Sequence, residues 1–186
     1  MAEALSQIES ELQRLNGAPA PDEKPGGVGT VSFVAQCPFG AKDVLARVIS
    51  VLKIIDQVAL SDWPTVEQWG MKLPEWFTSA CTSPMTQQQA DAWLAGWKRL
   101  TPGEQARAES EKKWSLENWL YWMKPENRQW FWWDAKALED CDHIIVAVEV
   151  DAWPFPWGSL RWLFKVAGAS TLEPEPVDGI EHSSQT

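Results

Sequence analysis

The sequence has few residues of the kinds that most often perform catalysis or bind metal ions. Its 186 residues include only two histidines, three cysteines and one tyrosine. His143 lies two residues from Cys141, but a zinc site needs three or four ligands, and His182 lies in a polar segment without core residues. Because no nucleophile, base and orienting group are evident together, we predict that the chain is not an enzyme and binds no cofactor or metal.

Cysteine is also too scarce to predict a disulfide framework, because the three cysteines are odd in number and widely spaced. Residues 1–17 lack the basic start and the apolar run of a signal peptide. The most apolar segment, 44–60, is interrupted by Arg47, Lys53 and Asp56, which favours a buried helix over a membrane span. Together these features predict a cytoplasmic protein without a membrane association.

Positive charge is in short supply. The chain has 16 Lys and Arg residues against 26 Asp and Glu residues, and its net charge is −10. Nucleic acids and anionic membranes attract clustered basic residues, so both are disfavoured as partners. A basic protein is favoured, because opposite charges steer association and increase its rate.

Tryptophan is the residue that the sequence has in excess. The chain contains 14 tryptophans, and its hydrophobic content of 45% is ordinary for a globular protein. Tryptophan is large and rigid, with one N–H donor, so it serves both in cores and at binding hot spots. The sequence leaves open which of these two roles each tryptophan has.

Periodicity predicts an α+β fold, a mainly helical single domain with a small antiparallel sheet near the C-terminal third. We expect an N-terminal helix over 1–16, a flexible linker over 17–29, a globular domain over 30–170 and a disordered acidic tail over 171–186. The helix over 1–16 has an apolar stripe, and it either docks on the domain, contacts another chain or frays.

Within the domain, capping signals and alternation mark the elements. Thr86, Thr101 and Ser115 each precede a helical pattern, and Glu104 completes a capping box with Thr101. Residues 143–151 alternate between apolar and polar positions, which is typical of a strand, and 130–138 is its expected hairpin partner.

The segment after this strand raises the question of surface against core. Trp157, Leu160 and Phe164 share one face of a short expected helix, which predicts that they are buried. Trp153 and Phe155 lie in the preceding proline-rich turn, where helical burial does not account for them. We therefore expect these two aromatic side chains at the surface.

Acidic residues cluster around the expected hairpin. Residues 116–151 contain eight acidic and three basic residues, a net charge of −5. Carboxylates beside rigid aromatic side chains make a plausible hot-spot surface for a basic protein, although ordinary solubilising charge is the alternative. The predicted partner-binding residues are Asp134, Asp140, Asp142, Glu149, Asp151, Trp132, Trp153 and Phe155.

Segment 129–169, about a fifth of the chain, carries a resemblance to a known group of proteins. Its features are Trp133-Asp134, the strand ending Glu149-Val150-Asp151, and the segments 153–158 and 160–168. The segment resembles the C-terminal region of small bacterial immunity proteins of polymorphic toxin systems. The resemblance implies a cytoplasmic antitoxin that binds and blocks a cognate toxin domain. It assigns no binding residues.

Two other functions remain open at this point. Glu149 and Asp151 share a strand face, and paired carboxylates beside tryptophans suit a carbohydrate-binding or carbohydrate-cleaving domain. Exposed, coplanar tryptophan rings near those two residues would favour that function, and buried ones would count against it. The other alternative is a structural subunit of phage or secretion origin that assembles through its N-terminal helix. The oligomeric state is open.

Overall fold

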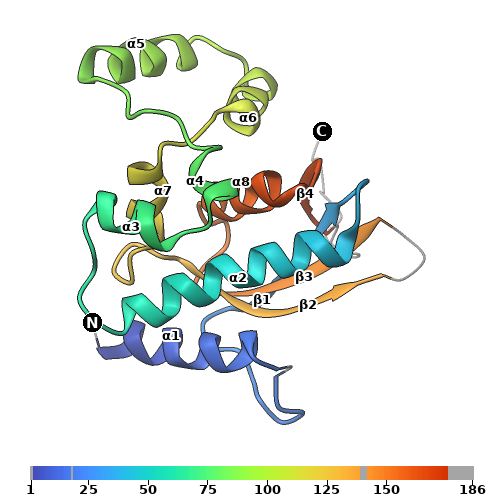
Figure 1. The fold of residues 1–186 in the computed structure, drawn as a ribbon. Helices are drawn as coiled ribbons and strands as arrows, with labels where there is room; N and C mark the ends of the chain where they lie inside the picture. Colours follow the sequence, from blue (N-terminus) through green and yellow to red (C-terminus); the bar gives the residue numbers. More distant parts are fainter. Residues whose placement is uncertain (1, 18, 139–141, 176–186) are drawn as a thin grey trace, which may run out of the picture.

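A four-stranded antiparallel sheet forms the centre of the protein (Figure 1). The computed structural model describes residues 2–17, 19–138 and 142–175. The strands are β1 (Gly29–Gln36), β2 (Trp130–Ala137), β3 (His143–Val150) and β4 (Thr171–Pro174), in the order β2-β3-β1-β4. The expected hairpin of 130–138 with 143–151 is thus confirmed as β2 and β3, and the α+β fold class is confirmed.

Helices make up most of the remaining described chain. They are α1 (Ala2–Leu15), α2 (Ala41–Ala59), α3 (Val66–Lys72), α4 (Glu75–Thr78), α5 (Gln87–Trp97), α6 (Pro102–Glu111), α7 (Leu116–Met123) and α8 (Gly158–Ala167). Thr86, Thr101 and Ser115 cap α5, α6 and α7 as predicted, because each side chain accepts a hydrogen bond from an amide in the first turn. Within the described ranges, no helix is both long enough and apolar enough to cross a membrane.

The core lies between the sheet and the two helices α2 and α8. On β3, Ile144, Val146 and Val148 are fully buried, as the alternating pattern predicts. Tryptophans fill much of this core. Two of their indole groups bind Ser159: Trp119 Nε1 donates to its carbonyl and Trp130 Nε1 to its hydroxyl, each at 3.0 Å, whereas Trp69 Nε1 and Trp162 Nε1 are buried without a hydrogen-bond partner among the described residues.

Helix α1 packs along α2 and the free edge of β2 (Figure 1). It is therefore part of the domain and not a separate element over 1–16. Of its apolar stripe, Leu5, Ile8, Leu12 and Leu15, the helix buries Ile8 and Leu15, while Leu5 and Leu12 are partly buried. It also buries Glu11 and Arg14, so charged side chains face the sheet.

The linker and the tail are both more tightly held than predicted. Glu23 binds Arg14, the Gly26 amide donates to Glu149, and the Val28 amide donates to the Val150 carbonyl, so 19–28 contacts the domain. The expected disordered tail begins with strand β4, whose Leu172 is buried. Residues 176–186 lie outside the described residues.

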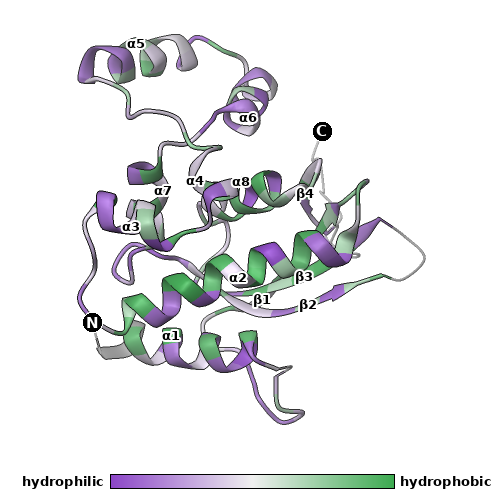
Figure 2. Cartoon of the chain, viewed as in Figure 1, coloured by the Kyte–Doolittle hydropathy of each residue, from purple (hydrophilic) through white to green (hydrophobic). Residues whose placement is uncertain are grey.

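Residues 83–113, which we term the arm, contain α5 and α6 and stand apart from the layers of the fold (Figure 1). Neither helix contributes a buried residue, and α6 is largely hydrophilic (Figure 2). The two ends of the arm meet, because the Thr82 amide donates to the Trp114 carbonyl at 3.0 Å beside a bridge from Thr82 to Ser115. The arm therefore leaves the domain and returns to it at one point.

Candidate functional site

Two of the predicted binding residues are core residues. Trp132 is 2% exposed and Phe155 is 6% exposed. Phe155 packs edge-to-face against Phe33 of β1, with ring centroids 6.2 Å apart. The prediction that both lie on a binding surface is wrong, because the alternation of β2 turns Trp132 inward and the turn after β3 folds Phe155 under the sheet.

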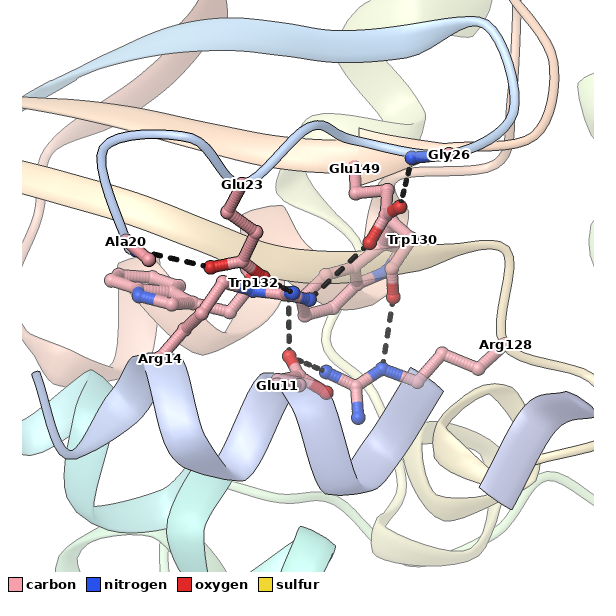
Figure 3. Close-up of polar contacts among 9 residues, drawn as sticks. All are labelled: Glu11, Arg14, Ala20, Glu23, Gly26, Arg128, Trp130, Trp132 and Glu149. Atoms are coloured by element: carbon pink, nitrogen blue, oxygen red, sulfur yellow. Dashed lines mark hydrogen bonds and ion pairs between the residues drawn. The ribbon is translucent and has the colours of Figure 1, made fainter. Parts of the chain in front are cut away.

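Glu149 is also withdrawn from the surface. It is 8% exposed, and its carboxylate accepts hydrogen bonds from Arg14 Nη2 at 3.2 Å and from the Gly26 amide (Figure 3). Asp151, by contrast, is exposed. The two carboxylates therefore do not face a common cleft, and Glu149 holds the linker and α1 on the sheet.

The Glu149–Arg14 pair adjoins a second set of buried charges. Arg128 Nη2 binds Glu11 at 2.6 Å and Arg128 Nη1 binds Asp56 at 3.0 Å, and all three side chains are fully buried. The Arg128 guanidinium also lies over the Trp130 ring, 4.6 Å from its centroid. Helix α1, helix α2 and the segment before β2 each contribute one charged side chain to this cluster.

The two carboxyl groups of this cluster, Glu11 and Asp56, both have raised pKa values. Burial raises the pKa of Glu11 well above its ordinary value, the Arg128 charge opposes this shift, and the neighbouring Asp56 charge adds to it. Burial also raises the pKa of Asp56, with Arg128 again opposing it. Glu11 Oε2 and Asp56 Oδ2 have no other hydrogen-bond partner. A proton retained on Glu11 would provide a hydrogen bond to Asp56 and leave a single negative charge opposite Arg128.

The buried charges also bind the outer edge of β2. Arg128 Nε donates to the Trp130 carbonyl, Arg14 Nε donates to the Trp132 carbonyl, and the Trp132 amide donates to Glu11 (Figure 3). The backbone amides and carbonyls of an edge strand are otherwise free to pair with a strand of another chain. The network is closed to solvent and stabilises the attachment of α1, so it is a structural site.

The exposed acidic side chains that remain are Asp134, Asp142 and Asp151, while Asp140 lies outside the described residues. Asp134 lies opposite Ala147 on the sheet face turned away from the core. Asp142 precedes β3 and Asp151 follows it, so they lie about 30 Å apart at roughly 3.3 Å per residue. The predicted acidic surface is therefore broad and thinly charged.

One end of this surface is more concentrated. Trp153 is 52% exposed and Val28 is 64% exposed, and both flank the exposed Asp151. The Trp153 ring rests edge-on against the buried Phe155 at 5.7 Å, and the Val28 amide is bonded to the Val150 carbonyl. We term Val28, Asp151 and Trp153 the strand-end patch. The prediction that Trp153 lies at the surface is confirmed.

A second feature was not predicted. A cleft of about 410 Å³ lies between the arm and the body of the domain. Aromatic side chains from α5, the segment before α7, α7, the turn before α8 and α8 line most of it: Trp93, Trp114, Trp122, Phe155, Trp157 and Trp162. These residues are distant in sequence, so only the folded chain brings them together.

The cleft also contains cations. Arg161 lies over the Trp157 ring, with Cζ 3.8 Å from the centroid, and Lys112 lies over the Trp93 ring, with Nζ 4.1 Å from the centroid. Lys165 donates to the Ser110 carbonyl across the cleft. One signal was available in the sequence: Trp157, Arg161 and Lys165 follow one another at intervals of four on a helix, and therefore share a face.

No family model matches the chain, and neither the curated proteins nor the solved structures give a match. Within the described part of the chain, no three His, Cys, Asp or Glu side chains are grouped so as to hold a metal ion. Cys37 is buried, and burial, with a smaller contribution from the Asp142 charge, raises the pKa of its thiol to about 11. This thiol is therefore protonated at neutral pH and is a poor nucleophile.

Proposed function

We propose that this chain is an immunity protein that binds a cognate, basic toxin domain and blocks it without performing catalysis. The observation that carries the proposal is the strand-end patch, an exposed tryptophan held in place beside an exposed carboxylate. Rigid aromatic anchors of this kind dominate binding energy at protein interfaces. The patch lies in the part of the chain that resembles immunity proteins.

The sheet face next to the patch has a composition that suits an interface. Val34, Ile145 and Ala147 on this face are partly exposed, and Asp134, Asp142 and Asp151 lie around or beyond them. Interfaces commonly have an apolar centre and a polar rim. The acidic rim would increase the rate of encounter with a basic surface, and Trp153 would slow dissociation.

The experiment is co-expression with the toxin encoded beside this gene. Trp153→Ala should weaken binding by about 2 kcal/mol or more and reduce survival. Tyr121→Ala is the matched control, because Tyr121 is 53% exposed and lies on α7 outside the patch. Survival and affinity equal to wild type for a folded Trp153→Ala variant would falsify the role of the patch.

The charged part of the proposal has its own pair of variants. Asp151→Lys should slow association and flatten its salt dependence, while Asp62→Lys, at another exposed acidic position, should have a smaller effect. Glu149→Lys does not serve as a test, since it would break the buried pair with Arg14 and destabilise the fold.

The two alternative functions have less support in the geometry. A stacked, nearly parallel tryptophan pair, Trp93 and Trp97, lies in α5 and not beside Glu149 and Asp151. The N-terminal helix turns its buried face towards its own sheet, so that face is not available for assembly with another chain. We therefore put neither forward.

A further inference from the structure

The tryptophan-lined cleft continues into a groove at each of its ends. Trp93 and Lys112 also line a hollow that includes Pro84 and Met85. Arg161 and Lys165 also line a hollow beside β4, together with Ser110 and segment 169–173. The three hollows thus share their boundary residues and form one groove along the base of the arm. A groove of this form fits an extended polypeptide better than a compact small molecule.

Arg161 is the unpaired cation at the centre of this groove. Its guanidinium stacks on Trp157, it forms no ion pair with any described residue, and its Nε is buried without a hydrogen-bond acceptor. A buried donor without an acceptor is unfavourable, so an acceptor supplied by a ligand would remove that cost. The planar guanidinium matches a carboxylate in geometry as well as in charge.

The charge of the cleft is opposite to that of the whole chain. The cations of the cleft are Lys112, Arg161 and Lys165, and its one acidic lining residue is Glu109, which is exposed. The hollows at its two ends add Lys113 and the exposed Glu111 and Glu173, so the excess of cations lies in the cleft itself. The chain as a whole carries a net charge of −10. The cations are therefore a local feature, and they favour a ligand with carboxylates. The aromatic walls favour flat apolar side chains on the same ligand.

We propose that this groove binds an extended segment of a partner protein in which acidic side chains are interspersed with aromatic ones. Carboxylates bind Arg161 and Lys112, and aromatic side chains pack between Trp93 and Trp157. The inference goes beyond the toxin-blocking function, because it uses none of the residues of the strand-end patch. Its test needs no toxin, so the two proposals fail separately.

The test is calorimetric titration of the full chain with a synthetic peptide, Glu-Phe-Asp-Gly-Glu-Phe-Asp. We expect saturable binding that weakens as salt is added, because salt screens the ion pairs. Two matched peptides serve as controls, one with lysine in place of every acidic residue and one with alanine in place of phenylalanine. Both should bind at least about tenfold more weakly, a difference that titration resolves.

Two variants locate the binding. Arg161→Met retains an aliphatic stem over Trp157. It should weaken the binding of the acidic peptide about tenfold or more, because a charge-assisted hydrogen bond is lost. Lys112→Met should weaken peptide binding less. This second variant tests the groove independently if Arg161→Met does not fold. The controls are Arg99→Met and Lys98→Met, at exposed positions between α5 and α6 that do not line the groove.

Three results would overturn the proposal. The first is no binding of the acidic peptide, and the second is binding that the Arg161 and Lys112 variants leave unchanged. The third is equal binding of phenylacetate and the peptide, which would indicate a small aromatic acid as the ligand and not an extended segment.

Discussion

At the scale of single residues, Arg128 lies opposite two fully buried carboxyl groups, Glu11 and Asp56. Replacing it by methionine leaves Glu11 and Asp56 buried without a cation, although the stem still packs against Trp130. Breaking a buried ion pair from one side destabilises a protein by about 3–5 kcal/mol. We expect a loss of this order for Arg128→Met in urea unfolding monitored by tryptophan fluorescence.

Arg107 provides the control for this prediction. It forms an ion pair with Glu111 on the surface of α6, and both side chains are largely exposed. Exposed pairs contribute little to stability, so Arg107→Met should leave the urea midpoint almost unchanged. Equal losses for the two variants would show that burial of Arg128 is not the source of its effect.

Glu11 gives the protein a pH-dependent stability. Its pKa is raised in the folded state, so the folded protein holds a proton that the unfolded chain releases. The contribution of Glu11 to the free energy of unfolding should therefore be largest below its ordinary pKa of 4.5. It should fall as the pH rises from 4.5 through the pKa of Glu11 in the folded protein. Glu11→Gln cannot lose that proton and should show a weaker decrease.

Urea unfolding of both proteins at several values between pH 5 and pH 8 measures this difference. The glutamine amide can still donate to Asp56, and its oxygen can still accept from the Trp132 amide and Arg128. A decrease in Glu11→Gln as steep as in wild type would assign the pH dependence to other groups. Asp56, whose pKa is also raised, would be the first of these.

At the scale of elements, α1 protects the outer edge of β2. The Trp132 amide donates to the buried Glu11 carboxyl, whereas the Ala135 amide, beyond the β-bulge, donates to the exposed Asp134 side chain. We expect the Trp132 amide to exchange with solvent far more slowly than the Ala135 amide, by about a factor of 100 or more, because exchange at Trp132 requires α1 to detach. Hydrogen exchange followed by NMR measures both amides, and similar rates would mean that α1 does not seal this edge.

The elements that could be predicted are those with local signals. Thr86 and Thr101 mark helix starts because a cap and its amide lie three residues apart, and the alternation over 143–151 follows from side-chain direction alone. The burial of Glu11 and Arg14 could not be predicted in this way. Their partners Arg128 and Glu149 lie more than 100 residues along the chain, and no local pattern pairs them.

The surface was predicted only in part for the same reason. Trp153 and Phe155 belong to one turn and have similar local surroundings in sequence, yet one is exposed and the other is buried. The difference comes from Phe33, on a strand far away in sequence, which packs against Phe155. The cleft likewise requires the arm to lie beside α8, an arrangement that no single segment determines.

At the scale of the whole molecule, the arm should be dispensable for folding. Its ends meet at Thr82 and Trp114, and α5 and α6 bury no residue. Replacing 83–113 with a short Gly-Ser linker should therefore reduce the free energy of unfolding by no more than about 2 kcal/mol. Cooperative urea unfolding and an unchanged set of NMR signals for β1 and β3 would support this, whereas loss of cooperativity would show that the arm belongs to the core.

The position of Arg128 also governs the order of events during synthesis. The ribosome releases α1 before the segment that carries Arg128, the partner of Glu11, which lies 117 residues further along the chain. At roughly 5–20 residues per second, this delay is on the order of ten seconds. During that time Ile8 and Leu15 have no sheet to cover them, and the solvated charges of Glu11 and Arg14 keep the nascent helix from associating with other chains. Helix α1 is thus synthesised before β2, the strand whose edge it covers.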